Sequence, residues 1–347
     1  MANRIDQPLR VESAMYANRV FLAPLSGITD VPFRRLARRF GAGAVVSEMV
    51  ASGEFVRGDR ESALRAMRDG DGLHVVQLAG RDPLWMRAAA ERLVDLGADV
   101  IDINMGCPAK KVVGGASGSA LMREPDLALQ LIEATVAGAG AVPVTLKMRL
   151  GWDRRSINAP ALAARAEAAG VRLVTVHGRT RDQFYQGQAD WPAIAAVRAA
   201  ISIPLVANGD LVERGQTAAM LEASRADAVM IGRGACGRPW FPGLLAGVVD
   251  ESQLATVRLA DLVCEHYEAM LVHYGAATGV RHARKHLAAY CERFAVATNG
   301  DLSRDRTTML TSTELPEVLR TVRATFSDCT VADMEAAPFL RVPRKAA

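Results

Sequence analysis

The chain has 347 residues, of which 50% are hydrophobic and 23% are charged, a composition typical of a globular protein with a sizeable core. Residues 1–18 contain no apolar signal segment, and no apolar run reaches the length of about 18 residues that a membrane span requires. The 5 scattered cysteines include no C-x-x-C pair, so free thiols and a cytoplasmic location are expected. The net charge of +4 is too small to indicate a nucleic-acid partner by itself.

Short β-branched runs alternate with Ala- and Leu-rich helical stretches along the first two thirds of the chain. The expected strands are residues 20–23, 44–47, 75–78, 100–103, 144–147, 173–176, 204–207 and 228–231. Several intervening helices begin with capping signals, such as Asp30, Asp82 and Asp190, each followed closely by proline. Eight such units over roughly 230 residues predict an α/β fold, a parallel (β/α)8 TIM barrel. A doubly wound open sheet is the alternative, but eight units fit a closed barrel better.

The pattern changes after residue 242, where strand signals stop. Apolar residues recur at helical spacing between Leu259 and Tyr274, and Gly275 follows as a stop. Further helices are expected at residues 280–294, 303–310 and 314–327. We therefore predict a barrel domain over residues 1–248, an all-helical C-terminal domain over 249–332, and a flexible tail over 333–347.

Polar or glycine-containing loops follow all eight expected strands, which is where the site of a parallel barrel lies. The most informative stretch is residues 99–111, in which an apolar strand stops at Asn104 and a Gly106-Cys107-Pro108 turn leads into two lysines. A lone thiol in such a strand-end loop indicates chemistry. The alternative is a buried structural cysteine.

The last two strands end in glycine-containing loops that could bind a phosphate through backbone N–H groups. These loops are Asn208-Gly209-Asp210 and Gly232-Arg233-Gly234. Gly232, Gly234 and Gly237 also spell G-x-G-x-x-G, but this motif follows the last strand instead of the first, which argues against a dinucleotide fold. Together with Lys147, Gln77 and the first-strand loop, the phosphate site suggests a flavin mononucleotide lying across the barrel mouth.

Six segments distributed from the first strand to the last resemble the tRNA-dihydrouridine synthases, most closely the bacterial B-type branch. They are APLSGITD (23–30), INMGCPAKKV (103–112), KMRLGWD (147–153), VHGRTR (176–181), ANGD (207–210) and IGRGACGRPW (231–240), and GVRHARKH (279–286) resembles the C-terminal helical domain of that branch. The resemblance implies an FMN enzyme that uses NADPH to reduce the C5–C6 double bond of a tRNA uridine. Hydride would reach C6 from the flavin, and Cys107 would protonate C5. A thiol of ordinary pKa, about 8.5, is mostly protonated at pH 7 and suits this role.

The resemblance also assigns residues to each function. FMN is expected to be held by Pro24, Leu25, Ser26, Gln77, Lys147, Asn208, Gly209, Asp210, Gly232 and Arg233, with His177 as a further contact to flavin or uracil. The candidates for tRNA contact are Asn104, Lys110, Lys111, Arg149, Arg154, Arg179, Arg281, Arg284 and Lys285. Residues 1–248 would then bind FMN and residues 249–332 tRNA. No metal is expected, because His282 and His286 lack the glutamate of a metalloprotease motif, and a monomer is expected.

Two other interpretations remain open. A flavin barrel acting on a free pyrimidine, like a dihydroorotate dehydrogenase, would use its thiol as a base and need no helical domain. A non-catalytic RNA-binding scaffold would hold no working flavin. A basic helical face at Arg34, Arg35, Arg38 and Arg39 is only weak support for a polyanionic partner, because such faces are usually just solvated.

Overall fold

The computed structural model describes residues 5–298 and 302–335 of the chain, except for the side chains of Lys110 and Lys111. The strands are β1 (Leu9–Val11), β2 (Ala14–Tyr16), β3 (Val20–Leu22), β4 (Ala44–Val45), β5 (Val50–Ala51), β6 (Val75–Ala79), β7 (Val100–Met105), β8 (Val144–Arg149), β9 (Val171–His177), β10 (Leu205–Asn208) and β11 (Ala228–Ile231). The helices around them are α1 (Val31–Arg39), α2 (Ser52–Val56), α3 (Arg60–Ala66), α4 (Pro83–Asp95), α5 (Lys110–Gly114), α6 (Pro125–Ala139), α7 (Ala159–Ala168), α8 (Trp191–Ala200), α9 (Thr217–Ser224) and α10 (Phe241–Ala246), with short 3-10 turns η1 (Gly118–Arg123), η2 (Arg214–Gln216) and η3 (Arg233–Ala235).

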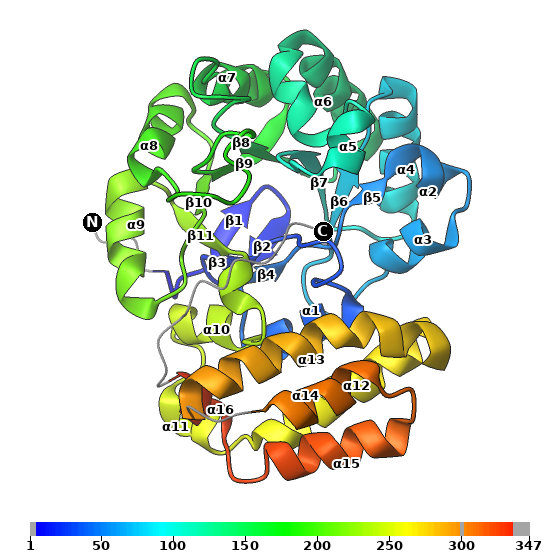
Figure 1. Cartoon of the computed structure of the whole chain (residues 1–347). Helices are drawn as coiled ribbons and strands as arrows, with labels where there is room; N and C mark the ends of the chain where they lie inside the picture. The colour runs from blue at the N-terminus through cyan, green and yellow to red at the C-terminus, as the bar shows by residue number, and fades with distance from the viewer. Residues whose placement is uncertain (1–4, 299–301, 336–347) are drawn as a thin grey trace.

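The predicted barrel is confirmed (Figure 1). Its strands lie in the order β4-β3-β11-β10-β9-β8-β7-β6-β5, and the pairs between them are parallel. The sheet closes between β4 and β6, because Val46 forms a parallel bridge to Val75 and the Ser47 N–H donates to the Val75 carbonyl at 3.1 Å. The expected strand at 44–47 therefore continues, after a break, as β5. Closure excludes the doubly wound alternative.

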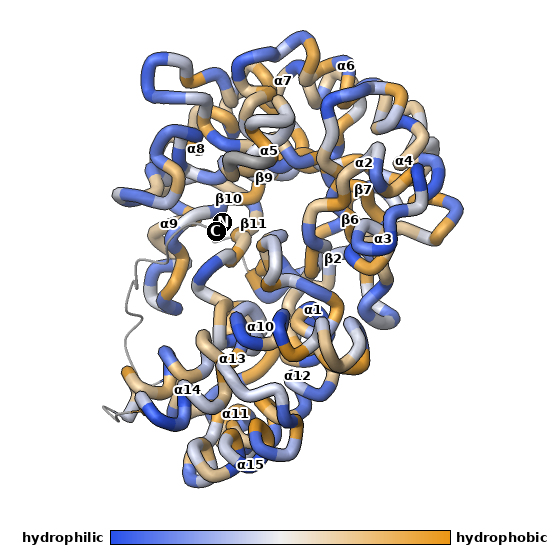
Figure 2. The backbone as a smooth tube through the Cα atoms, turned by 45° about the vertical axis from the view of Figure 1, so that its right-hand side comes forward, coloured by the Kyte–Doolittle hydropathy of each residue, from blue (hydrophilic) through white to orange (hydrophobic). Residues whose placement is uncertain are grey.

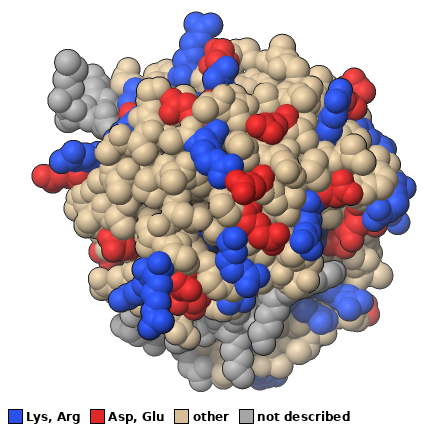
Figure 3. Space-filling model, turned by 90° about the horizontal axis from the view of Figure 1, so that it is seen from above, with Lys and Arg blue, Asp and Glu red and all other residues tan. Residues whose placement is uncertain are grey.

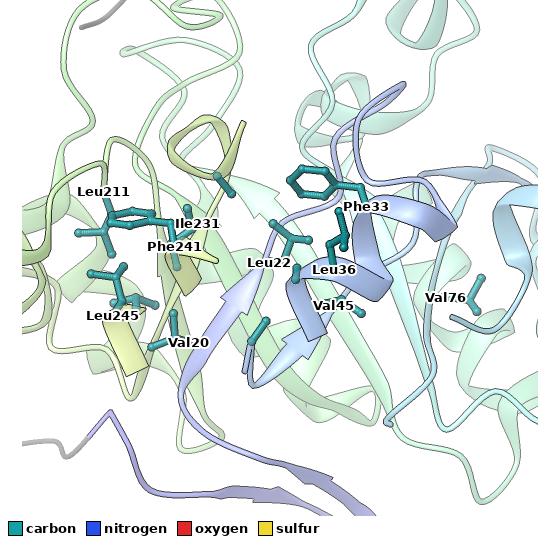
Figure 4. Packing of buried hydrophobic residues seen from close by; sticks show 14 of the residues in the cluster. Val20, Leu22, Phe33, Leu36, Val45, Val76, Leu211, Ile231, Phe241 and Leu245 are labelled. Atoms are coloured by element: carbon teal, nitrogen blue, oxygen red, sulfur yellow. The ribbon is translucent and has the colours of Figure 1, made fainter. Parts of the chain in front are cut away.

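Side chains alternate between the two faces of each barrel strand and so form two separate hydrophobic cores. Outward residues such as Ile101, Ile103 and Ile231 pack with the surrounding helices, and Figure 4 shows this packing where Leu22 and Val45 face Leu36 of α1. Inward residues such as Val100 fill the barrel. Figure 2 shows hydrophobic strands inside the molecule and hydrophilic segments on the outer loops. Because side chains alternate with a period of two, the polar residues on the Val100 face of β7 must also point inward.

A β-hairpin that the sequence analysis did not predict closes the amino-terminal end of the barrel. Its strands β1 and β2 pair antiparallel, and their buried side chains pack with inward residues of the barrel strands. Tyr16 stacks on Phe21 with ring centroids 4.7 Å apart. Runs of three residues are too short for a periodicity signal to identify. With this end filled by apolar side chains, polar groups can collect only toward the opposite, carboxyl end.

Further helices pack against one side of the barrel, beside α1 and α10 (Figure 1). They are α11 (Glu251–Ala255), α12 (Leu259–Tyr274), α13 (Ala276–Thr298), α14 (Ser303–Thr311), α15 (Leu315–Thr325) and α16 (Val331–Glu335). The expected helix ending at Gly275 is confirmed as α12, and the other three expected helices correspond to α13, α14 and α15. In the described part of the chain, no helix combines the length and the apolar character needed to cross a bilayer.

Helix α16 extends to Glu335, beyond residue 333 where the tail was expected to begin. The Glu335 carboxylate accepts hydrogen bonds from Arg238 Nε at 2.6 Å and from Trp240 Nε1 at 2.7 Å. Trp240 and Arg238 belong to the barrel, so these bonds tie the last helix to it. The rest of the expected tail, residues 336–347, lies outside the described residues.

A buried polar cluster joins the barrel to the helical region. Asp30 caps α1 by accepting from the Phe33 N–H at 3.0 Å, and its other oxygen lies 3.1 Å from His286 Nε2 on α13. His266 Nδ1 lies 3.0 Å from the Tyr290 hydroxyl. Burial alone would raise the pKa of Asp30, but the charge and hydrogen bond of His286 outweigh burial and lower it. Asp30, His266 and His286 are close enough to hold a cation together, but we assign them to this hydrogen-bonded junction.

The arginines of α1 do not form the basic face considered from the sequence. Arg34 is buried and donates to Asp69 at 2.8 Å, and Arg38 binds the same carboxylate at 2.7 Å. Arg39 binds Glu265 of α12 at 2.6 Å. Figure 3 shows basic and acidic side chains interspersed on the face over α6 and α7 as well. Neither place offers a surface of one sign to a polyanion.

Candidate active site

The inward polar residues at the carboxyl ends of the strands meet at the barrel mouth. Strand pairing places Asn104 beside Lys147, and His177 beside Asn208. Lys147 Nζ donates to Asn208 Oδ1 at 3.2 Å, and Asn208 Nδ2 donates to the Met230 carbonyl at 2.8 Å. These residues are far apart in the sequence, and the closed barrel brings them together as predicted.

The mouth is strongly electropositive. Burial and the neighbouring Arg149 lower the pKa of Lys147 to about 8. Burial also lowers the pKa of His177 well below its usual value, and the cations Arg149, Lys147, Arg179 and Arg233 add to this effect. Arg179 Nη1 lies 3.2 Å from His177 Nε2. Because a guanidinium can only donate, Nε2 is the acceptor and the neutral ring carries its proton on Nδ1.

The loop that carries Cys107 is fixed on both sides. Asn104 Oδ1 accepts from the N–H of Gly106 at 3.2 Å and from that of Cys107 at 3.0 Å. Ser119 Oγ donates to the Cys107 carbonyl at 2.8 Å, and Arg149 Nε donates to the Gly106 carbonyl at 2.8 Å. The half-buried thiol therefore sits on a rigid turn directly after β7.

The surroundings of Cys107 keep its proton in place. Burial raises the pKa of the thiol, and a hydrogen bond from the Ala109 backbone together with the charges of Arg149 and Lys147 opposes this only in part. The thiol is thus protonated at neutral pH. The same N–H and cations would stabilise the thiolate once the proton has left, which is the combination that a general acid needs.

The loops after β10 and β11 fit the predicted anion site. Gly209 has φ of +121°, and a Cβ there would lie 2.8 Å from the Cβ of Ala189, so this position requires glycine. A Cβ at Gly232 would make ordinary van der Waals contact with Leu25 Cδ2 at 3.8 Å and Ala23 Cβ at 3.9 Å, so this loop lies beside the first-strand loop. Glycine-containing loops that offer backbone N–H groups next to cations suit the phosphate of a flavin mononucleotide.

The side chain of Asp210, a residue expected to help hold FMN, bonds to other groups of the chain. Its carboxylate accepts from Arg179 Nη2 at 2.6 Å, from the Ala189 N–H at 2.8 Å and from Arg233 Nη2 at 3.3 Å. We therefore assign the Asp210 side chain to orienting the two guanidiniums.

Two of the arginines expected to contact tRNA, Arg149 and Arg179, are buried, whereas a third, Arg284, is partly exposed. Arg149 and Arg179 are 1% and 0% exposed. Arg149 Nη1 donates to the carbonyls of Thr180 and Phe184, both at 2.8 Å, and Arg179 Nη2 to that of Gly187 at 2.7 Å. Buried guanidiniums bonded to carbonyls shape the site and cannot serve as surface contacts to phosphates. Arg284 is partly buried, and its Nη2 donates to the Thr311 carbonyl at 3.3 Å.

The remaining predicted residues lie as follows. Pro24 and Leu25 are half-buried and Ser26 is exposed. Arg154 and Arg281 are exposed, as is Lys285, whose Nζ lies against Gly27 so closely that a Cβ there would overlap it. Lys110 and Lys111 begin helix α5, but their side chains lie outside the described part of the structure.

The sequence analysis missed several residues of the site. Tyr185 lies between two guanidiniums, 5.6 Å from Arg149 and 5.0 Å from Arg233 measured to its ring centroid. Asp102 and Thr145 lie inside the barrel and bond to each other at 2.6 Å. The sequence contained a signal for both as inward residues. Asp102 stands two residues before Asn104, and Thr145 stands two residues before Lys147, so each shares the face of a predicted inward residue.

Comparisons with known proteins agree with this geometry. The family model described as "Dihydrouridine synthase (Dus)" matches residues 21–325. The chain belongs to the dihydrouridine synthase family. It is 61% identical over 283 residues to a "Probable tRNA-dihydrouridine synthase" of Rhizobium leguminosarum bv. phaseoli, covering 82% of this chain and 88% of the relative. It is 45% identical over 287 residues to "tRNA-dihydrouridine synthase B" of Pseudomonas aeruginosa, covering 81% and 86% of the two chains.

Solved structures of lower identity share the fold. An old yellow enzyme homologue from Zymomonas mobilis matches with a TM-score of 0.50 at 15% identity, over 71% of this chain and 93% of that one. A 2-naphthoyl-CoA reductase matches with a TM-score of 0.58 at 11% identity, over 94% and 70%. Membership of the dihydrouridine synthase family makes this chain a flavin-dependent oxidoreductase.

Proposed function

We propose that this dihydrouridine synthase reduces the C5–C6 double bond of specific uridines in tRNA, with FMN as its flavin and NADPH as its electron donor. The single observation that carries the proposal is the half-buried thiol of Cys107, which Asn104 and Ser119 hold on the turn after β7 beside an electropositive barrel mouth. When bound, the flavin supplies hydride to C6 of the uracil. The chain's own residues must hold the reactants and supply the proton.

Cys107 is the proposed general acid. Its Sγ gives a proton to C5 of the uracil and becomes a thiolate, which the Ala109 N–H, Arg149 and Lys147 stabilise. Positioned acids of this kind contribute about 10²- to 10⁴-fold to a rate. Because the thiol is half-buried and not sealed, a proton from solvent can restore it for the next turnover.

The proposed FMN site uses the first-strand loop, the mouth and the last two loops. Leu25 lies beside Gly232, and Pro24 and Ser26 flank Leu25 in the first-strand loop. Lys147 would place its charge near the pyrimidine edge of the ring, where reduction builds up negative charge, and neutral His177 can donate from Nδ1. Backbone groups of Gly209 and Gly232 with the Arg233 side chain would hold the phosphate.

The proposed tRNA path runs from α13 to the barrel mouth. Arg281 and Lys285 are exposed and one helical turn apart on α13, and Lys285 reaches the loop at Gly27. Arg154 is exposed on the loop after β8. We propose that these cations bind backbone phosphates while the target base leaves its stack and enters the mouth, which costs a few kcal/mol. On this proposal residues 249–332 are the tRNA-binding domain, and the protein acts as a cytoplasmic monomer.

The test begins with dihydrouridine measured position by position in tRNA from cells that lack this protein. Complementation with the wild type should restore one position, and Cys107→Ala should not. Cys236→Ala, which removes another partly exposed thiol, is the matched control and should restore it. If purified wild type with FMN and NADPH leaves unmodified tRNA unchanged but reduces a free pyrimidine, the tRNA assignment is wrong. A protein without flavin or turnover would support an RNA-binding scaffold instead.

A further inference from the structure

A chain of buried side-chain hydrogen bonds runs beneath the active site and ends at the Cys107 loop. Thr145 Oγ1 donates to Asp102 Oδ1 at 2.6 Å, and Gln77 Nε2 donates to Asp102 Oδ2 at 2.6 Å. Asn104 Nδ2 donates to Gln77 Oε1 at 2.7 Å. The Asn104 Oδ1 atom then accepts the N–H groups of Gly106 and Cys107. All four side chains of the chain are buried, from strands β6, β7 and β8.

The carboxylate at the base of this chain is energetically unfavourable for the fold. Asp102 is 4% exposed and binds two neutral donors, a hydroxyl and an amide. Burial raises its pKa, while the two hydrogen bonds and the charge of Lys147 oppose that rise. An apolar residue of similar size would fill the same interior position without the desolvation cost of a charge. The presence of a carboxylate here calls for a reason other than stability.

The direction of each bond in the chain follows from Asp102. Both of its oxygens accept, one from Thr145 and one from Gln77, so the Gln77 amide turns its nitrogen toward Asp102 and its oxygen toward Asn104. That oxygen in turn draws the Asn104 nitrogen, which leaves the Asn104 oxygen facing the N–H groups of the Cys107 loop. If the Gln77 amide were reversed, its nitrogen would face the Asn104 nitrogen and the chain would break.

We propose that Asp102 is a positioning residue, which orients the Gln77 and Asn104 amides and thereby holds the Cys107 turn where the thiol can reach the substrate. This inference rests on the proposed function of Cys107 as the general acid. Asp102 bonds to Gln77 and Thr145 and acts on the Cys107 turn through the Gln77 and Asn104 amides. Thr145 assists by occupying the other carboxylate oxygen.

Asp102→Leu and Asp102→Asn separate this role from packing. Leucine offers no acceptor, so Gln77 loses its anchor. Asparagine can still accept from Gln77 through Oδ1 while its nitrogen donates to the Thr145 hydroxyl, so it should rescue the leucine defect. Adding Thr145→Val to Asp102→Asn removes that second partner and should abolish the rescue. Thr135→Val is the matched control, since Thr135 is a buried threonine on α6 whose hydroxyl donates to the Leu131 carbonyl at 2.7 Å.

The first readout is alkylation of Cys107 by iodoacetamide in protein without substrate, followed at each cysteine by mass spectrometry. Asp102→Leu should raise the Cys107 rate by about fivefold or more, because a loosened turn opens the half-buried thiol, while Cys236 and Cys329 stay unchanged. The second readout is the rate of dihydrouridine formation in a single turnover, which should fall about 100-fold. The KM for tRNA in steady-state turnover should change little. Asp102→Asn and Thr135→Val should remain within about threefold of wild type in both.

Several results would overturn the inference. One is a Cys107 alkylation rate in Asp102→Leu that is no faster than wild type, and another is an Asp102→Asn defect as large as that of Asp102→Leu. If Asp102→Leu does not fold, Asp102→Asn with Thr145→Val decides by the same two readouts. Wild type that alkylates normally but makes no dihydrouridine would refute the proposed function, and the alkylation comparison would still decide whether Asp102 holds the turn.

Discussion

Raising the pH from 7 to 9 should remove the positive charge of Lys147 from the barrel mouth. Burial and Arg149 bring the pKa of this amine from 10.5 to about 8. That displacement corresponds to about 3 kcal/mol of disfavoured charging. A group with this pKa is roughly 90% protonated at pH 7 and roughly 10% at pH 9. If the charge supports the reduced flavin, the turnover rate should fall about ninefold over this range.

The fold should not weaken over the same range because of Lys147. A lysine whose pKa is lower in the folded than in the unfolded protein destabilises the fold wherever it is protonated, below about pH 8. As the pH rises from about 8 toward 10.5, that destabilisation is relieved. Activity should therefore decline while thermal unfolding shows no loss of stability attributable to this group. The decline should also precede ionisation of Cys107, whose pKa is raised.

The assay is dihydrouridine formation under saturating tRNA and NADPH at half-unit pH intervals, for the wild type and Lys147→Met, with flavin saturation verified spectroscopically at each pH. Lys147→Met should be slow throughout and should lack the inflection near pH 8. Lys285→Met, which removes an exposed amine instead of a buried one, is the matched control and should retain the inflection. An unchanged inflection in Lys147→Met would refute the reasoning, because another group would then be titrating.

Three further predictions concern the anion site and the tRNA surface. Gly209→Ala should weaken flavin binding measured by fluorescence titration, since the position combines φ of +121° with no room for a Cβ; unchanged affinity would contradict this. Arg179→Met should lower the free energy of unfolding in urea by about 1.5–3 kcal/mol, because it removes the charged donor at 2.6 Å from the buried Asp210 carboxylate while Arg233 and the Ala189 N–H still bind it; a loss under about 1 kcal/mol would count against the pair. Lys285→Ala should raise the KM for tRNA and reduce the slope of log affinity against log salt by about 0.7–0.9, whereas Arg258→Ala, at an exposed cation on another part of the helical region, should not.

The sequence by itself determined the barrel and most of its mouth. Apolar runs, capping residues and strand-end motifs are local signals, and they located all eight barrel strands, α12 with its stop at Gly275, and the Cys107 turn. Because parallel strands end at one edge of a barrel, local motifs such as Asn104 and Asn208 could be placed together without a structure. The sequence did not predict the very short strands β1, β2 and β5, because they contain too few residues for an alternation of apolar and polar side chains to be recognised.

Only the tertiary structure decided which charged side chains face solvent and which polar groups bond to one another. The sequence places Arg149 and Arg179 at strand ends, where cations are expected to be exposed. Both are buried, however, and donate to carbonyls of the loop after β9. Asp102 finds its partners 25 and 43 residues away along the chain. Hydrogen bonding depends on distance and direction in three dimensions, whereas a sequence motif fixes only the spacing along the backbone. The motif therefore identified the thiol, and the closed barrel determined what holds it.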